Sequence, residues 1–405
     1  MNPPLQAALE RSQRKRKWLA FYLTSPALAF LVITFVVPIG SVLVASVHNP
    51  IFIKTLPTLG NALHQWNGED MPPHRVTSAL AEDLLTAEQP GRVLGLLNSR
   101  VAGFRSLLVK TRSSLQELAA ARSIEAVVTD TNLMAKLITI DPRWGQRRYW
   151  TAMHQASAPY TIYYFLRAFD HQFDTDGNIV PLPENRRRFV SVILRTLGIC
   201  TLVTVLANLI AFPIAYLLAT SPSRQRSYLL LLVIMPLWIS LLIKTSGWLV
   251  SLQSQGVLND AALALGLWDE RVQLVYNRIG TYVAMVHILI PYAALPLFGI
   301  MKGIDPNHMR AASALGASPA RAFLRVYLPQ ALPGIAASIL IVFVLALGLY
   351  IPPALVGGPA DQMLSGMIAR AGSRAPLSVI LLCIVAIFLL IYRRAFVLIA
   401  GSLKP

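Results

Sequence analysis

Six segments of the 405-residue chain are apolar and long enough to cross a lipid bilayer. A run of about 18 or more apolar residues spans the hydrocarbon core when it is helical. We therefore expect an all-α integral membrane protein with six transmembrane helices. The expected spans are 18–46, 189–220, 228–250, the run between Arg278 and Lys302, the run from Arg325 past Tyr350, and the run between Arg374 and Arg393.

The composition agrees with a membrane protein and argues against an ordinary soluble enzyme. Only 14% of the residues are charged, whereas soluble domains carry about 25%. The mean hydropathy is +0.55. The two cysteines, Cys200 and Cys383, lie in apolar runs, which argues against a disulfide scaffold or a zinc cluster. We interpret both as buried structural thiols.

A net charge of +17 is typical either of a protein that binds nucleic acid or of one with basic segments at the cytoplasmic face of a membrane. The positions of the charges favour the membrane protein. With both termini in the cytoplasm, the inner pieces hold 14 Lys and Arg and only two acids. The two short outer loops hold four Arg and four acids. This bias follows the positive-inside rule, so nucleic-acid binding is not expected. The inner pieces are 1–17, 221–227, 302–334 and 393–405, and the outer loops are 251–279 and 352–376.

The first apolar run follows five basic residues, as a signal peptide would, but it exceeds a signal-peptide core of 7–15 residues. We interpret it as a retained signal anchor in a multi-pass protein of the bacterial inner membrane. The expected domains are a cytoplasmic basic tail (1–17), the first transmembrane helix (18–47), an external insertion (48–188) and a five-helix core (189–403).

The insertion at 48–188 is nearly neutral, with 16 Lys and Arg against 13 Asp and Glu. Segments longer than about 60 residues cross membranes regardless of charge, which allows it to lie outside. Helical spacing of apolar residues at 76–85, 92–121 and 143–169 predicts a small, mostly helical domain. Residues 170–183 are rich in turn-forming residues.

Within that tract, Asp174, Asp176 and Asn178 resemble the start of a calcium-binding loop. Position 12 of such a loop needs a bidentate acid, and Asn185 stands there. We therefore favour a simple Asx turn and predict no metal site.

The loop between the fourth and fifth spans has regular helix signals. Asp305 and Pro306 form an N-cap followed by proline, which predicts a helix through Leu315. Gly316 provides a left-handed stop, and Ser318 with Pro319 starts a second short helix. The loop is therefore predicted to be a helix–turn–helix on the inner face.

Two uses of this loop stay open from the residues alone. Small residues and apolar side chains surrounded by basic residues suit a short helical segment that docks in a groove of a cytoplasmic partner. A basic loop lying on anionic lipid is the alternative. The small residues are Ala311, Ala312 and Ala314, the apolar ones are Met309, Leu315 and Phe323, and the basic ones are Arg310, Arg321 and Arg325.

The pattern Arg310-Ala-Ala-x-x-Leu-Gly316, followed by Ala317-Ser-Pro319 and by Leu328-Pro, resembles the EAA loop of ABC importer permeases. The resemblance covers about 189–392 and the first span. Runs beginning at Pro236, Val286, Met301 and Pro353 are similar to spermidine/putrescine-type permeases.

The resemblance implies that residues 305–328 form the coupling helix that sits in a cleft of an ATPase subunit. The roles carried over fall on Ala311, Ala312 and Gly316. Arg310 replaces the family's leading glutamate, so a glutamate-mediated contact is not carried over. The expected coupling residues are Arg310, Ala311, Ala312, Leu315, Gly316, Ala317, Ser318, Pro319 and Phe323.

The resemblance further implies that the chain is a permease subunit for a small solute, a polyamine by subgroup, delivered by an external binding protein. The other implied partners are two ATPase subunits, which hold ATP and Mg, and a second homologous permease. The chain has no Gly-x4-Gly-Lys-Ser/Thr loop and no catalytic motif, so we expect no enzyme activity and no cofactor of its own.

No Asp or Glu lies inside any span, which weighs against a proton- or sodium-coupled carrier. A secondary carrier or channel, and ABC import of another small solute, remain the alternatives. A membrane-anchored sensor is disfavoured because the longest inner segment has about 33 residues. Aromatic faces offer a path for a cation, although interfacial packing is the simpler interpretation. The path candidates are Trp238, Tyr282, Tyr292, Tyr350 and the acid Asp361, which we expect to be solvated.

Overall fold

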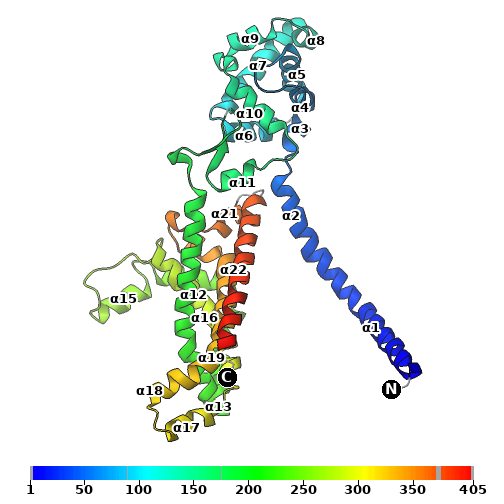
Figure 1. Ribbon diagram of the computed structural model, residues 1–405. Helices are drawn as coiled ribbons and strands as arrows, with labels where there is room; N and C mark the ends of the chain where they lie inside the picture. Colours follow the sequence, from blue (N-terminus) through cyan, green and yellow to red (C-terminus); the bar gives the residue numbers. More distant parts are fainter. Residues whose placement is uncertain (1–2, 89, 175, 371–374, 403–405) are drawn as a thin grey trace. The chain divides into compact units, whose positions relative to one another are not determined.

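The computed structural model describes residues 3–88, 90–174, 176–370 and 375–402, and helices make up most of them (Figure 1). The chain divides into two compact units, Met1–Arg186 and Arg187–Pro405. The predicted all-α membrane fold is confirmed.

The first unit contains a long N-terminal helix and a bundle of shorter helices. Its helices are α1 (Pro3–Leu31), η1 (Val32–Val36), α2 (Val37–Val47), α3 (Ile51–Thr55), α4 (Pro57–His64), α5 (His74–Thr86), α6 (Gly91–Arg100), α7 (Phe104–Arg122), α8 (Ile124–Val128), α9 (Leu133–Ile140), η2 (Pro142–Gly145), α10 (Arg147–Ser157), α11 (Tyr163–Ala168) and η3 (Glu184–Arg186).

The apolar stretch Lys15–Val47 runs through α1, the π-helical η1 and α2. None of the residues in its most apolar 18-residue window is buried by other parts of the described chain. Its apolar side chains are therefore left for lipid or for another subunit, as expected of a membrane anchor.

The 48–188 region folds around aromatic side chains from α7, η2 and α10. Trp144 and Trp150 are fully buried, with ring centroids 4.8 Å apart. The Trp144 indole donates to the Thr111 hydroxyl at 2.8 Å, and the Trp150 indole donates to the Trp144 carbonyl at 2.8 Å. Both buried N–H groups are thus satisfied, which lets these large side chains form the core.

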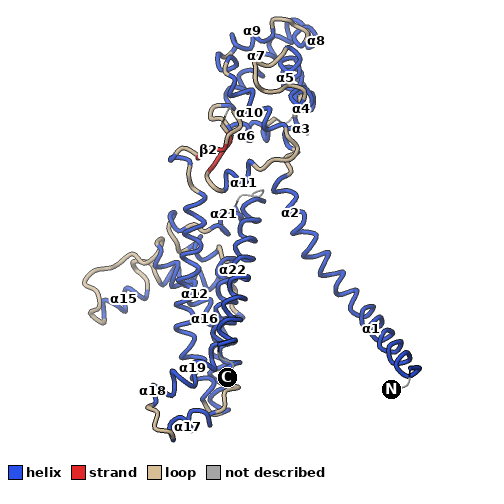
Figure 2. Tube along the Cα trace, in the orientation of Figure 1, coloured by secondary structure: helices blue, strands red, loops and turns tan. Residues whose placement is uncertain are grey.

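The tract predicted as turns contains a two-stranded antiparallel hairpin, β1 (His171–Phe173) paired with β2 (Ile179–Pro181) (Figure 2). At its tip, Asp174 Oδ1 accepts the backbone N–H groups of Asp176 and Asn178, each at 2.9 Å. This is the predicted Asx turn. The strands were missed because each is only three residues long.

The second unit contains the remaining spans. Its helices are α12 (Phe189–Thr220), α13 (Ser223–Ile234), η4 (Met235–Trp238), α14 (Leu241–Ser251), α15 (Val257–Ala264), α16 (Arg278–Met301), α17 (Pro306–Ala314), α18 (Pro319–Ala322), η5 (Phe323–Tyr327), α19 (Leu328–Gly348), α20 (Ile351–Leu355), η6 (Pro359–Asp361), α21 (Leu364–Arg370) and α22 (Ala375–Ser402).

Helices α12, α16 and α19 pack against one another, and α22 packs on α19 (Figure 1). Ala207, Ala211 and Ala215 recur every four residues on α12 and are fully buried in this core. A Cβ on Gly334 of α19 would lie 3.0 Å from the Ile300 Cβ of α16. Small residues at these positions permit the close helix approach on which packing in lipid depends.

Within the described residues, five helices are long and apolar enough to cross a membrane. The predicted third span, 228–250, is not one straight helix: Ser223–Trp238 and Leu241–Ser251 meet at 95°. The α-helix α13 ends at Ile234, Pro236 lies in the 3-10 turn that follows, and Ile239 is extended at the break. The bent pair counts as a sixth span if both parts enter the membrane. Arg374, the predicted start of the last span, lies outside the described residues.

The prolines inside α12 and α16 do not interrupt these helices. Pro213 lies inside α12, and Pro291 and Pro296 lie inside α16, and both helices continue past them.

An ion pair in the first unit makes its stability depend on pH. Asp141 is buried and accepts Arg143 Nε and Nη2 at 2.9 and 2.8 Å, which lowers the pKa of Asp141 to about 2. Because the folded pKa lies below the unfolded value, this stabilisation is present above about pH 4 and is lost as the pH falls towards 2.

We predict that Asp141→Asn lowers the free energy of unfolding of this unit by about 2 kcal/mol at pH 7. The deficit should shrink between pH 4 and pH 2, as measured by hydrogen exchange of α7 and α9 amides in the intact chain. Asp176→Asn is the control, because its pair with Arg147 at 3.5 Å is exposed and should contribute less than about 1 kcal/mol. A deficit for Asp141→Asn that is independent of pH would contradict the prediction.

Candidate functional site

The loop between α16 and α19 forms the predicted helix–turn–helix. The Asp305 carboxylate accepts the Asn307 N–H at 2.8 Å and caps α17, and the Ser318 hydroxyl accepts the Arg321 N–H at 3.4 Å and caps α18. Between the helices, Gly316 adopts φ +83°, a left-handed conformation that residues with a Cβ rarely adopt. The Ala317 N–H bonds back to the Ala312 carbonyl at 3.0 Å and closes the turn.

The surface around Gly316 is open in the described chain. No residue of α17 is buried, and the Leu315 side chain is 89% exposed. A single exposed leucine is common on protein surfaces, so this exposure makes Leu315 available for a contact and its coupling role stays a prediction. Arg310, Ala311, Ser318 and Pro319 are also exposed, while Ala312 and Ala317 are half-buried.

Phe323 does not project outward as the sequence suggested. It is half-buried, and its ring lies within 6.1 Å of three aromatic rings, in edge contact with Phe212 and Tyr216 of α12 and stacked on Tyr327. Met309 likewise packs against the helical core. Of the three apolar side chains expected to face a partner, Leu315 is the one that does so freely.

A second contact joins α17 to α19. His308 Nδ1 lies 2.9 Å from Gln330 Oε1, and Gln330 Nε2 donates to the Val326 carbonyl at 2.8 Å. Together with the aromatic cluster of Phe212, Tyr216, Phe323 and Tyr327, this contact connects the loop to two core helices. The loop is therefore held against α12 and α19 by packed and hydrogen-bonded side chains.

The aromatic path candidates are not gathered in one place. Trp238 of η4 is 78% exposed, Tyr282 and Tyr292 are half-buried on α16, and Tyr350 follows α19. No ring contact joins any two of these four among the described residues. A role for them in a path stays a prediction.

Asp361 is not the solvated acid that the sequence suggested, because it is only 4% exposed. It accepts Arg278 Nε at 2.9 Å and the Gly358 N–H at 3.2 Å. Arg195 donates to the backbone carbonyls of Gln362, at 3.1 Å, and Ala360. We call this group the Arg278–Asp361 clamp. It fastens the segment after α20 to α12 and α16.

Sequence reasoning missed the two arginines of the clamp as functional partners. A signal was available, because Arg195 is a cation near the start of a span, and charged residues there are rarely unpaired. What pairs with it depends on the path of the chain 165 residues later, which the sequence pattern does not specify.

His287 is hydrogen-bonded, as expected for a structural histidine. The Trp248 indole of α14 donates to His287 Nδ1 of α16 at 3.1 Å. This bond fastens the short limb of the bent helix pair to the core.

Comparisons with known proteins match half of the chain or more. The family model described as binding-protein-dependent transport system inner membrane component matches residues 185–404. The spermidine/putrescine transport system permease protein PotB of Escherichia coli (strain K12) is 30% identical over 214 residues, covering 51% of this chain and 78% of that protein. The inner membrane ABC transporter permease protein YdcU of the same organism is 29% identical over 221 residues, covering 50% and 71%.

Among solved structures, a bacterial ABC transporter involved in the import of the acidic polysaccharide alginate is similar, with 20% identity and a TM-score of 0.41. The similarity covers 71% of this chain and 97% of that one. The family match begins at residue 185, so residues 48–184 lie outside it.

The clamp gives a direct prediction. Asp361→Asn removes the negative charge and leaves Arg278 beside a neutral amide. Breaking a fully buried pair costs about 3–5 kcal/mol, but Arg278 is 52% exposed, so we expect a loss of about 1–3 kcal/mol. Thermal unfolding of the purified chain in detergent measures it.

Asp260→Asn is the matched control. Asp260 pairs with Arg271 at 2.7 Å, but both side chains are exposed, so the change should stay below about 1 kcal/mol. Equal losses of stability for the two substitutions would show that burial of Asp361 does not increase the contribution of the clamp to the free energy of unfolding.

Proposed function

The chain belongs to the binding-protein-dependent inner membrane components of ABC importers, and from that premise we propose that it forms the translocation path for a polyamine and is driven by a separate ATPase. It is a multi-pass inner-membrane permease subunit. The main support for coupling to a separate ATPase is the turn around Gly316. This turn is exposed, its flanking helices are capped, and it contacts two core helices.

The geometry of the turn supports a coupling role. The exposed Leu315 and the neighbouring alanines suit insertion into a groove, and the caps at Asp305 and Ser318 keep both short helices rigid. Arg310 is exposed and bonds only weakly to Asn307, at 3.2 Å, so it is free to meet an acid of a partner. A partner that moves the turn would rotate α12 and α19 and alternate access to the path.

The chain has no phosphate-binding loop of its own, so nucleotide hydrolysis belongs to other subunits. We propose two ATPase subunits, holding ATP and Mg, on the face that carries residues 305–328. We propose that this face lies in the cytoplasm with both termini and that the 48–188 region lies outside, and the excess of Lys and Arg in these connections supports that orientation.

The remaining partners follow from the family and from the exposed helices. The family's description names a binding protein, and we propose that it delivers the solute from outside. A second, similar permease would cover apolar side chains of this chain that no described residue packs against. Such side chains include Leu194, Val205 and Leu209 on α12.

The polyamine assignment rests on the similarity to PotB, whose name states spermidine and putrescine. No acid lies within the spans, so selection of a cation would fall mainly to the binding protein and to aromatic faces. Import of another small solute by the same mechanism is the alternative that this composition leaves open.

We predict that cells carrying the complete transporter take up radiolabelled spermidine or putrescine, and that excess unlabelled polyamine suppresses the uptake. Deleting this chain should abolish it. Uptake of another solute without uptake of either polyamine would contradict the polyamine assignment and would leave the proposed permease function intact. Transport into vesicles that contain this chain alone, without nucleotide, would instead support a carrier or channel.

We further predict that Gly316→Val lowers uptake about 5- to 30-fold, because a left-handed β-branched residue costs about 1–2 kcal/mol and distorts the turn. Gly316→Asn is the matched control, since asparagine tolerates this conformation and should keep most of the uptake. Immunoblots of membranes check that both variants reach the bilayer. Normal uptake by Gly316→Val would argue strongly against a coupling role for this turn.

A further inference from the structure

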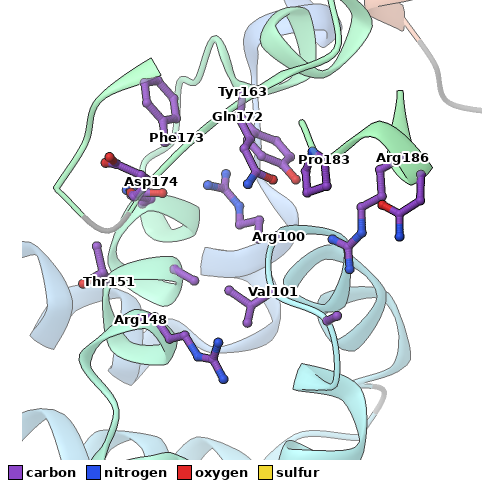
Figure 3. Close-up of a pocket in the computed structure, with 14 residues that line it drawn as sticks. Arg100, Val101, Arg148, Thr151, Tyr163, Gln172, Phe173, Asp174, Pro183 and Arg186 are labelled. Atoms are coloured by element: carbon purple, nitrogen blue, oxygen red, sulfur yellow. The ribbon is translucent and has the colours of Figure 1, made fainter. Parts of the chain in front are cut away.

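The first unit contains a pocket of about 500 Å³ that the proposed transport function does not use. It lies among the C-terminal end of α6, the helices α10 and α11, strand β1 and the segment 183–186. We call it the Arg100 pocket. The polar groups that matter below are Arg100, Arg148, Thr151, Tyr163, Asp174 and Arg186 (Figure 3).

Arg100 is the unusual member of the lining. It is the last residue of α6 and only 9% exposed, yet its Nε and Nη2 have no hydrogen-bond partner in the described part of the chain. Its guanidinium lies 4.0 Å from the centre of the Tyr163 ring, which stabilises the charge from one face only. Burial lowers the pKa of Arg100 from its usual value.

Burying a guanidinium with two donors that no described protein acceptor pairs is unfavourable, because the hydrogen bonds that those donors make to water in the unfolded chain are not replaced by protein. The ring of Tyr163 cannot accept in-plane N–H groups of the fork. The Arg100 side chain lies in the middle of the lining residues in Figure 3. Arg100 therefore contributes to the pocket wall a charge whose Nε and Nη2 donors no described protein acceptor uses.

A second orphan group lies in the same lining. The Thr151 hydroxyl of α10 is buried and has no partner among the described residues. A hydroxyl and a planar guanidinium fork are both donors to an oxyanion. Two independent unsatisfied donors in one pocket are more than an isolated packing defect explains.

The charge of the lining favours an anion. Among the described lining residues there are three arginines, Arg100, Arg148 and Arg186, and one carboxylate, Asp174. Asp174 is occupied by the hairpin turn, because its Oδ1 accepts two backbone N–H groups, and these bonds lower its pKa. The lining thus presents an excess of positive charge.

The pocket is also held in shape by bonds that do not involve Arg100. Gln155 Nε2 of α10 donates to the Asp174 carbonyl at 3.1 Å, and the Tyr163 hydroxyl donates to the Ser99 carbonyl at 3.1 Å. These bonds connect α10 to the hairpin and α11 to α6. The donors therefore sit on a preorganised frame, which favours ligand binding.

We propose that the Arg100 pocket binds a small solute through a carboxylate or phosphate group. The Arg100 fork takes two oxygens of the group, the Thr151 hydroxyl takes one, and Arg148 and Arg186 contribute long-range attraction. A polyamine is repelled by the same charges, so this is a separate ligand site and not a station on a polyamine path. The proposal does not depend on the transport function.

The test uses the full chain in lipid nanodiscs and isothermal titration with sodium phosphate, sodium citrate and spermidine, at an ionic strength matched with sodium chloride. The wild-type chain should bind phosphate or citrate saturably and should not bind spermidine in competition with them. Phosphate alone points to a phosphate-bearing solute, and citrate alone points to a carboxylate.

Arg100→Met keeps the side-chain volume and removes the charge. It should weaken anion binding at least tenfold and, since the unpaired charge is gone, raise the unfolding temperature of the unliganded chain. Arg92→Met is the matched control, because Arg92 lies on the same helix but is exposed and outside the pocket. Its anion affinity should stay within twofold of wild type.

Thr151→Val is the second variant. It is nearly isosteric and removes the hydroxyl that has no hydrogen-bond partner among the described residues. It too should weaken anion binding without lowering the stability of the chain. The proposal is overturned if neither phosphate nor citrate binds the wild-type chain saturably, or if both variants bind them as the wild type does. It is equally overturned if Arg100→Met lowers the unfolding temperature and leaves anion binding unchanged, because Arg100 would then be a purely structural residue.

Discussion

The hydrocarbon core of the membrane is the constraint on which the structure of this chain depends. Backbone N–H and C=O groups find no partner in lipid, so each crossing segment must satisfy them internally as a helix. The long helices follow directly, and so do the small residues between them. Packing in lipid gains little from hydrophobicity, and α12, α16 and α19 therefore rely on close approach at Ala207, Ala211, Ala215 and Gly334.

The same rigid core gives the Gly316 turn its proposed use. A flexible basic loop would deform without moving the core helices when a partner displaces it. This turn instead has capped helices on both sides and side-chain contacts to α12 and α19. Phe323 belongs to these contacts, because its ring packs on Phe212 and Tyr216 of α12. At the clamp, Asp361 fastens a second irregular segment to the same helices.

Much of the fold could be predicted because apolar run length and helix-cap residues are local signals. Five of the six predicted spans, the caps at Asp305 and Ser318, and the left-handed Gly316 are present in the described residues. The break near Ser240 was missed, since Pro236 and the surrounding apolar residues read equally well as a kinked span. The roles of the coupling and path residues stay predictions, because no partner or solute lies against them.

The sequence by itself determined that this chain spans a membrane, that the segments 221–227 and 302–334 are basic, and that the second of them contains a capped turn, because each property depends on neighbouring residues. Tertiary structure alone decided that Asp361 pairs with Arg278, that Phe323 turns inward, and that two buried donors of Arg100 have no hydrogen-bond partner among the described residues. These outcomes depend on groups far apart in the chain, 83 residues in the case of the clamp. The residues next to a charged or aromatic side chain in the sequence do not indicate which distant residues it will contact in the fold.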